Sequence, residues 1–274
     1  MYSLWNNFKT TMLMAGLMGL CLGIGYMIGG PQALIPALVL GGAMNVVAFF
    51  LSDKIALATM RAQEISPEQD PTLYRIVEKL TERANLPMPK VCISPANAPN
   101  AFATGRNPRH SAVCVTIGLR QMLNDEELEG VIAHELAHVK HRDVLISTIA
   151  AVVAGAISVL GYFALFFGDR RRNPLVGILL MIFAPIAAGI IQMAISRSRE
   201  YEADREGARL AGSPRGLANA LIKLHQGNQH VRTPIPDSQA NMFIVQPLTG
   251  REMANLFSTH PPVEERVARL RQMD

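Results

Sequence analysis

Three histidines and two acids are concentrated in the stretch GVIAHELAHVKHRD, residues 130–143. His134 and His138 are four residues apart, so on a helix their rings leave the same face one turn apart, close enough to bind one metal ion. Glu135 points about 60° round the helix axis from His138. Its carboxylate could therefore act as a general base on a water at the metal without binding the metal itself. The pattern predicts the site of a zinc-dependent hydrolase.

A catalytic zinc ion usually has three protein ligands and one open position. His141 is not expected to be the third ligand, because seven helical residues place it roughly 10 Å from His134, whereas zinc bonds are about 2 Å long. The segment REYEAD offers Glu200 and Asp204, which share a helix face four residues apart. One carboxylate could bind the metal and the other could orient a ligating imidazole. The spacing alone leaves open that both acids are simply solvated.

The surrounding sequence predicts the elements that position these residues. Asn124 is suited to cap the helix that carries the histidines, and the histidines are expected on the face that Leu128 and Ile132 make apolar. Other expected elements are helices at Asp70–Leu86, Ser196–Gly212 and Val263–Met273, strands at Lys90–Ser94, Asn100–Thr104 and Ala112–Leu119, and a loop-like region at Gln226–Gln246. The predicted catalytic domain therefore combines several helices with a small sheet.

Hydrophobic residues make up 49% of the 274 residues, and long stretches carry no charge. Residues 10–52 could form two membrane spans joined by the turn IGGPQ, and residues 144–168 and 174–196 could form one span each. A cleavable signal peptide is a poorer interpretation of the N-terminus, because a second apolar span follows directly. Four transmembrane helices are therefore expected.

These patterns divide the chain into four parts: an N-terminal transmembrane hairpin (1–52), a first catalytic part with HELAH (53–143), a second transmembrane hairpin (144–196) and a second catalytic part with the third zinc ligand (197–274). The expected fold class is an α+β membrane protein, predominantly helical, whose zincin-like catalytic domain carries a small β-sheet. In this interpretation the second hairpin interrupts a single catalytic domain.

The net charge of +4 is modest, and the basic residues do not alternate with aromatic ones as they do on nucleic-acid platforms. We therefore expect a lipid bilayer, and no nucleic acid, as partner. Lys9, Lys54 and Arg61 flank the first hairpin, which predicts that the catalytic parts face the cytoplasm. The basic loop GDRRRNP conflicts with this orientation, since two further spans would place it on the far side. Either its arginines reach far-side headgroups or the second hairpin does not cross completely.

Four motifs in order, NAFATG, HELAH, EYEAD and STHPPVEER, resemble the HtpX family of membrane zinc metallopeptidases, relatives of the type I CAAX prenyl proteases. The resemblance covers nearly the whole chain. It implies one zinc ion held by His134, His138 and Glu200, with Glu135 as catalytic base. Asp204 would lie behind the ligands and support one of them.

The resemblance also implies roles outside the zinc ligands. Asn100, Ala101, Phe102 and Ala103 would form an exposed strand edge to which an extended substrate adds, although without the family an ordinary buried strand would be the simpler interpretation. His260 would donate to the developing oxyanion, and Arg266 would support substrate binding. The implied protein is an endopeptidase of the bacterial inner membrane that acts in stress response and quality control, with damaged or misfolded membrane proteins as substrates.

Two other functions remain as alternatives. An intramembrane protease would place the histidines inside a span, but the charged flanks NDEELEG and VKHRD favour chemistry in the polar domain. A non-catalytic zinc-dependent scaffold or sensor is the second alternative. Glu135 argues against it, because a structural zinc site is normally closed by four ligands and has no use for a free acid beside it.

Overall fold

The computed structural model describes residues 2–146, 197–230 and 261–273. Most of the predicted second transmembrane hairpin, the greater part of the predicted loop after Gln226, and His260 lie outside these residues. The expectations for those segments, including the crossing of the second hairpin, therefore stay predictions.

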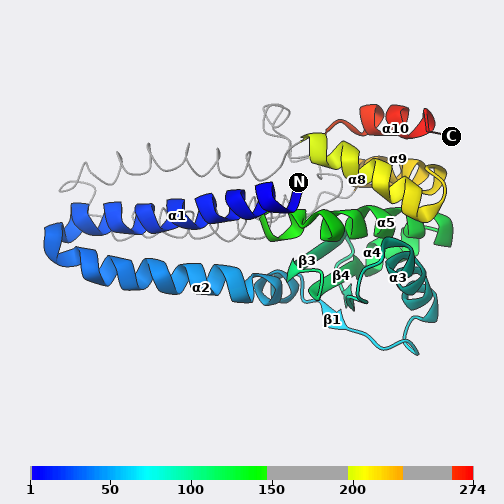
Figure 1. The fold of residues 1–274 in the computed structure, drawn as a ribbon. Helices are drawn as coiled ribbons and strands as arrows, with labels where there is room; N and C mark the ends of the chain where they lie inside the picture. The colour runs from blue at the N-terminus through cyan, green and yellow to red at the C-terminus, as the bar shows by residue number, and fades with distance from the viewer. Residues whose placement is uncertain (1, 147–196, 231–260, 274) are drawn as a thin grey trace.

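Two long antiparallel helices extend from one end of the described structure (Figure 1). They are α1 (Tyr2–Gly29) and α2 (Leu34–Thr59), joined by the short 3-10 helix η1 (Gly30–Ala33) at the predicted turn. Among the described residues, one helical segment, Gly30–Leu51, is long and apolar enough to cross a membrane. Four transmembrane helices are thus not confirmed. Ile35 and Val39 of α2 are 74% and 67% exposed, as lipid-facing residues would be.

The opposite end carries a four-stranded mixed sheet in the order β1-β2-β4-β3. Its strands are β1 (Gln63–Glu64), β2 (Lys90–Ser94), β3 (Ala101–Asn107) and β4 (His110–Thr116). β2 and β4 are parallel, whereas the other two pairs are antiparallel. β4 ends earlier than predicted, because Thr116 caps the short helix α4 (Ile117–Met122) with its hydroxyl. β3 pairs with β4 alone among the described strands, so it forms an edge of the sheet.

Helix α5 (Asp125–His141) carries the histidines and lies at the centre of the described domain. It begins with a capping box, in which Asn124 accepts from the backbone of Glu127 and Glu127 accepts from that of Asn124. It ends where Arg142 adopts a left-handed conformation, with φ of 60°. The predicted start of this helix is confirmed.

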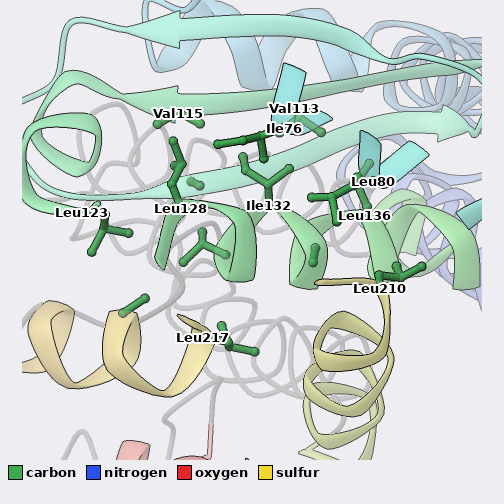
Figure 2. Close-up of a cluster of buried hydrophobic side chains, with 14 of the residues drawn as sticks. Ile76, Leu80, Val113, Val115, Leu123, Leu128, Ile132, Leu136, Leu210 and Leu217 are labelled. Carbon is green, nitrogen blue, oxygen red and sulfur yellow. The ribbon is translucent and has the colours of Figure 1, made fainter. Parts of the chain in front are cut away.

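The main hydrophobic core lies between α5, the sheet and α3 (Pro71–Ala84). Figure 2 shows Leu128, Ile132 and Leu136 of α5 pointing towards the strands and α3. A second cluster on the opposite face of the sheet joins Ala56 and Met60 at the end of α2 to Phe102. The sheet is therefore covered on both faces, and α2 is attached directly to the catalytic part of the chain.

Three further helices complete the described domain: α8 (Arg197–Ala211), α9 (Arg215–His230) and α10 (Val263–Arg271). The first and last agree with the sequence prediction. The interpretation of Gln226–His230 as loop was wrong, because α9 continues through these residues. Leu217, Leu221 and Leu224 of α9 join the main core, and this tertiary packing stabilises a helix whose polar C-terminal end does not indicate one.

Candidate active site

The helices α5 and α8 approach each other closely at Gly207. A Cβ atom at this position would lie 2.9 Å from the backbone nitrogen of His134 and 3.0 Å from its Cα. A larger residue would therefore have to push α8 away from α5. The glycine allows the contact that brings Glu200 and Asp204, which stand on α8, beside the imidazoles of α5.

We expect Gly207→Ala to destabilise the domain, although alanine usually favours a helix over glycine by about 1 kcal/mol. The clash is with backbone atoms that cannot rotate away, and overpacking of this kind costs about 1–3 kcal/mol. The variant should show a lower thermal unfolding midpoint and less zinc per chain after dialysis. Gly16→Ala is the matched control, since its Cβ would meet nothing within 4 Å. An unchanged midpoint and zinc content for Gly207→Ala would contradict the close approach.

Three donor groups converge in the space between the two helices. The Nε2 atoms of His134 and His138 are 3.2 Å apart. Glu200 places Oε2 3.7 Å from Nε2 of His134 and Oε1 3.5 Å from Nε2 of His138. Two ligands with zinc bonds of about 2.0–2.1 Å lie roughly 3.3 Å apart in a tetrahedral site, so the spacing fits. His141 does not belong to this group of three.

The donor chemistry fits a metal ion as well as the spacing does. Two imidazole nitrogens that face each other at 3.2 Å direct lone pairs at one another unless a proton or a cation lies between them. His134 and Glu200 are 1% and 5% exposed, so little water is available to relieve this repulsion. Two neutral imidazoles and one carboxylate form a three-ligand set with an open fourth position, as catalytic zinc requires.

Each imidazole also has a carboxylate behind it. Oδ1 of Asp204 lies 2.9 Å from Nδ1 of His134, although the N–H direction deviates from a well-formed hydrogen bond. Oδ2 of Asp143 lies 3.3 Å from Nδ1 of His138. Such carboxylates fix the tautomer and the ring orientation of ligating histidines. Asp143 was missed from the sequence. It follows Arg142, whose left-handed conformation ends α5, and no glycine or asparagine in the sequence indicates this helix end.

The electrostatics of these groups follow from burial and from the surrounding acids. Burial opposes the charged form of His138, but Asp143, Glu200 and Glu135 together raise its pKa to about 9. A metal ion at Nε2 would therefore have to displace a proton at neutral pH. Burial favours the neutral form of Asp204, yet the neighbouring Arg266 and His134 lower its pKa to about 2. Asp204 is thus ionised where it contacts His134.

Arg266 of α10 lies behind Asp204 and is completely buried. Its Nε donates to Oδ2 of Asp204 over 2.8 Å, and its Nη2 donates to Oδ1 over 2.6 Å. Its Nη1 lies 3.8 Å from Oε2 of Glu200. The guanidinium thus forms a two-pronged pair with the carboxylate that stands behind His134. The role in substrate binding that the sequence resemblance implies for Arg266 stays a prediction.

Arg266→Ala should destabilise the protein by about 3–5 kcal/mol, because it leaves Asp204 buried without its partner. Arg266→Lys keeps the charge but not the planar fork, so we expect an intermediate loss. Thermal unfolding measures both effects. Arg271→Ala, on the exposed side of the same helix, is the control and should leave the free energy of unfolding within about 0.5 kcal/mol of the parent value. Equal stability of Arg266→Ala and Arg271→Ala would refute the proposed importance of the buried pair.

Glu135 is held against the sheet edge rather than among the three donors. Its Oε2 accepts from the backbone N–H of Ala103 over 2.9 Å, and its side chain is nearly buried. Ala103 lies in the edge strand β3 and is half-buried. The carboxylate of Glu135, the three donor residues and the edge of β3 therefore lie next to one another.

The segment Asn100–Ala103 differs in part from the expected exposed edge. Asn100, Ala101 and Phe102 have buried side chains. Asn100 precedes the strand, and its N–H donates to the hydroxyl of Thr116 over 2.8 Å. The side chains of these three residues therefore belong to the core, and at the strand edge the N–H of Ala103 is taken by Glu135.

The comparison with known families agrees with this geometry. A profile of peptidase family M48 matches residues 67–274, which include α5, α8 and the sheet residues beside them. The chain belongs to peptidase family M48. Two relatives named Protease HtpX homolog, from Paraburkholderia phytofirmans and Burkholderia ambifaria, are 50% and 51% identical to it, each over 98% of both chains. The resemblance to HtpX that the motifs indicate is confirmed, and the M48 chain is a membrane metalloprotease.

A solved structure, the crystal structure of S. mikatae Ste24p, shares the fold of this M48 chain. The TM-score is 0.54 at 18% sequence identity, and the match covers 98% of this chain and 66% of the other. At this identity the likeness shows the fold alone. A predominantly helical architecture with a small mixed sheet is therefore confirmed.

Proposed function

We propose that the chain is a zinc-dependent endopeptidase anchored in the bacterial cytoplasmic membrane, with its catalytic domain in the cytoplasm. The observation that carries this proposal is the geometry of His134, His138 and Glu200, whose donor atoms have the spacing of a three-ligand zinc site. Zinc held there would lower the pKa of a bound water towards neutrality and polarise the scissile carbonyl group. One zinc ion per chain is expected.

The residues of the chain have separate tasks in this mechanism. Glu135 takes the proton of the attacking water and returns it to the leaving amine. The N–H of Ala103 holds one carboxylate oxygen of Glu135, which leaves the other free to accept that proton. Asp204 and Asp143 contact Nδ1 of the two imidazoles and orient the rings, so that both Nε2 atoms would be available to hold zinc. His260 is proposed to donate to the oxyanion as the peptide carbonyl is attacked.

A scaffold or sensor that only binds zinc is supported less well. Three protein ligands leave one position open, whereas structural zinc sites are closed by four. The described residues place a buried carboxylate, Glu135, beside the donors but outside the group. Burying an ionisable group costs free energy. Such groups are common where they act in catalysis, so a general base explains the buried Glu135 better than a scaffold does.

The proposed substrates are damaged or misfolded membrane proteins, cleaved in a stress-related quality-control role. The names of the relatives support a protease of the HtpX type. The apolar surface of α2 supports a location in the bilayer, where such substrates are found. No nucleic acid is expected as partner.

The function can be tested by incubating the purified, zinc-loaded protein in detergent with a mixture of denatured proteins. We expect internal cuts, mapped by mass spectrometry, which disappear after removal of zinc with a chelator and return when zinc is added. Removal of residues from chain ends only would contradict an endopeptidase. Full activity of a preparation shown to contain no metal would contradict the zinc mechanism.

A further inference from the structure

The edge strand β3 connects the candidate active site to the membrane helix α2. Near its start, the backbone of Ala103 contacts the carboxylate of Glu135. Three residues later, the guanidinium of Arg106 lies over the ring of Phe50, 5.6 Å from the ring centroid. Phe50 belongs to the apolar segment Gly30–Leu51 and is the last residue but one within it. One short strand therefore reaches from the catalytic base to the end of a membrane span.

The packing of α2 fixes this relationship. Phe102, at the start of β3, lies in one hydrophobic cluster with Ala56 and Met60 at the C-terminal end of α2. Arg106, four residues further along the strand, contacts α2 at Phe50, which is closer to the bilayer. The strand thus runs alongside the helix and towards the membrane as it leaves the site.

Charges mark where the bilayer surface lies. Asp53 and Lys54 are the first charged residues after the apolar segment of α2. The far end of the β3–β4 hairpin carries Arg106 together with the exposed Arg109 and His110. Basic side chains at this level are suited to anionic lipid headgroups. Both elements therefore place the end of β3 at the membrane boundary.

The length of β3 sets the distance between the candidate active site and the membrane boundary. Residues in a regular strand rise about 3.3–3.4 Å each, so Arg106 lies at most about 10 Å beyond Ala103, because the irregularity at Gly105–Asn107 bends the strand. β3 pairs with β4 on one side only among the described strands. Beyond Ala103, whose N–H is taken by Glu135, a peptide that adds to the other edge of β3 would extend at the same rise per residue. A bond placed at Glu135 would then be separated from the bilayer by about three to five peptide residues.

We propose that β3 acts as a ruler, so that the enzyme selects the extended segments of membrane proteins immediately outside a membrane span and cuts them at a fixed distance from the bilayer. This inference rests on the proposed peptidase function and adds the substrate class and the cut position. Recognition would depend on backbone pairing along the edge and on the position of the span, rather than on a particular amino-acid sequence.

The hairpin is built to hold its shape. Gly105 has φ of 137°, and a Cβ there would lie 2.1 Å from the carbonyl oxygen of His110. The register between β3 and β4 shifts at this point, which is typical of a β-bulge. The N–H of His110 donates to the side chain of Asn107 over 3.0 Å and closes the turn. A rigid hairpin is what a measuring element requires.

The test uses the full-length enzyme with zinc, reconstituted in lipid vesicles with a model protein that has one span followed by a tail of mixed sequence. A second model protein carries an insertion of about four residues between the span and the same tail, which extends it by roughly 13 Å. Cut positions are mapped by mass spectrometry. In both proteins we expect cuts about three to five residues from the span. The cut in the second protein should therefore fall about four residues earlier in the chain relative to the tail sequence.

Glu135→Gln enzyme in parallel vesicles identifies the cuts that depend on the site. Glu135-dependent cuts at the same tail sequence in both proteins, or spread evenly along the tail, would overturn the ruler while supporting the peptidase. The absence of any Glu135-dependent cut in the vesicles would overturn the ruler, and its additional absence with denatured proteins in detergent would overturn the peptidase as well.

Discussion

Replacing Glu135 with glutamine should reduce peptide cleavage by about 10²–10⁴-fold, the usual contribution of a general base, while the zinc content stays at one ion per chain. Glutamine has nearly the same shape and can still accept from the N–H of Ala103 through its amide oxygen. It cannot accept a proton from water. Glu135 lies outside the group of three donors, so zinc binding should be unaffected.

Zinc per chain after dialysis and the rate of cleavage are measured on the same preparation. Glu126→Gln is the matched control, because Glu126 lies on the same helix with an exposed side chain. It should retain the parent activity and zinc content. Undiminished cleavage by Glu135→Gln would remove the general-base mechanism and favour the scaffold interpretation, whereas loss of zinc from this variant would indicate that Glu135 binds the metal.

Local signals predicted the elements that carry the site. The start of α5 is indicated by Asn124 and Glu127, which form a capping box. The spacing of His134 and His138 brings the two rings together on any helix. Each depends on residues within one or two turns. The HtpX resemblance also predicted a contact between distant parts of the chain, because its motifs connect α5 with Glu200 on a helix far along the sequence.

The parts that sequence reasoning missed depend on how distant elements pack. The histidines were expected on the face of Leu128 and Ile132, but α5 is covered on several sides. Its leucines point towards the sheet (Figure 2). Nδ1 of His134 lies 2.9 Å from Oδ1 of Asp204 on α8. Periodicity identifies one apolar face, and it cannot tell which buried positions of a helix face the core and which face a metal site when most of the helix is covered.

The contacts of Arg266 also could not be predicted from the local sequence. The resemblance to the HtpX family implies that it supports substrate binding, and the local sequence says nothing of a buried partner for it. Only the packing of α10 against α8 places its guanidinium on Asp204. The paired carboxylate lies 62 residues earlier in the chain, and no local pattern connects the two.

Replacing Glu200 with alanine should empty the metal site or weaken it greatly, which would also abolish cleavage. Glu200 supplies the one carboxylate of the donor group, with oxygens 3.5 Å and 3.7 Å from the two imidazole nitrogens. Without it, two neutral imidazoles remain, and zinc would keep only two protein ligands. Asp204→Ala should instead lower zinc affinity or activity by about 10–100-fold, as losses of groups behind a ligand do.

Position on one helix makes this comparison informative. Glu200 and Asp204 stand one turn apart on the same face of α8, and both are buried, at 5% and 4% exposure. Glu202 lies between them and pairs with Arg205 over 3.4 Å near the surface, so Glu202→Ala controls for the loss of an acid from α8. Zinc per chain after extensive dialysis and circular dichroism are measured for all three variants. If folded Glu200→Ala protein retains one tightly held zinc ion, Glu200 is not the third ligand, and His141 or His260 must be reconsidered for that position.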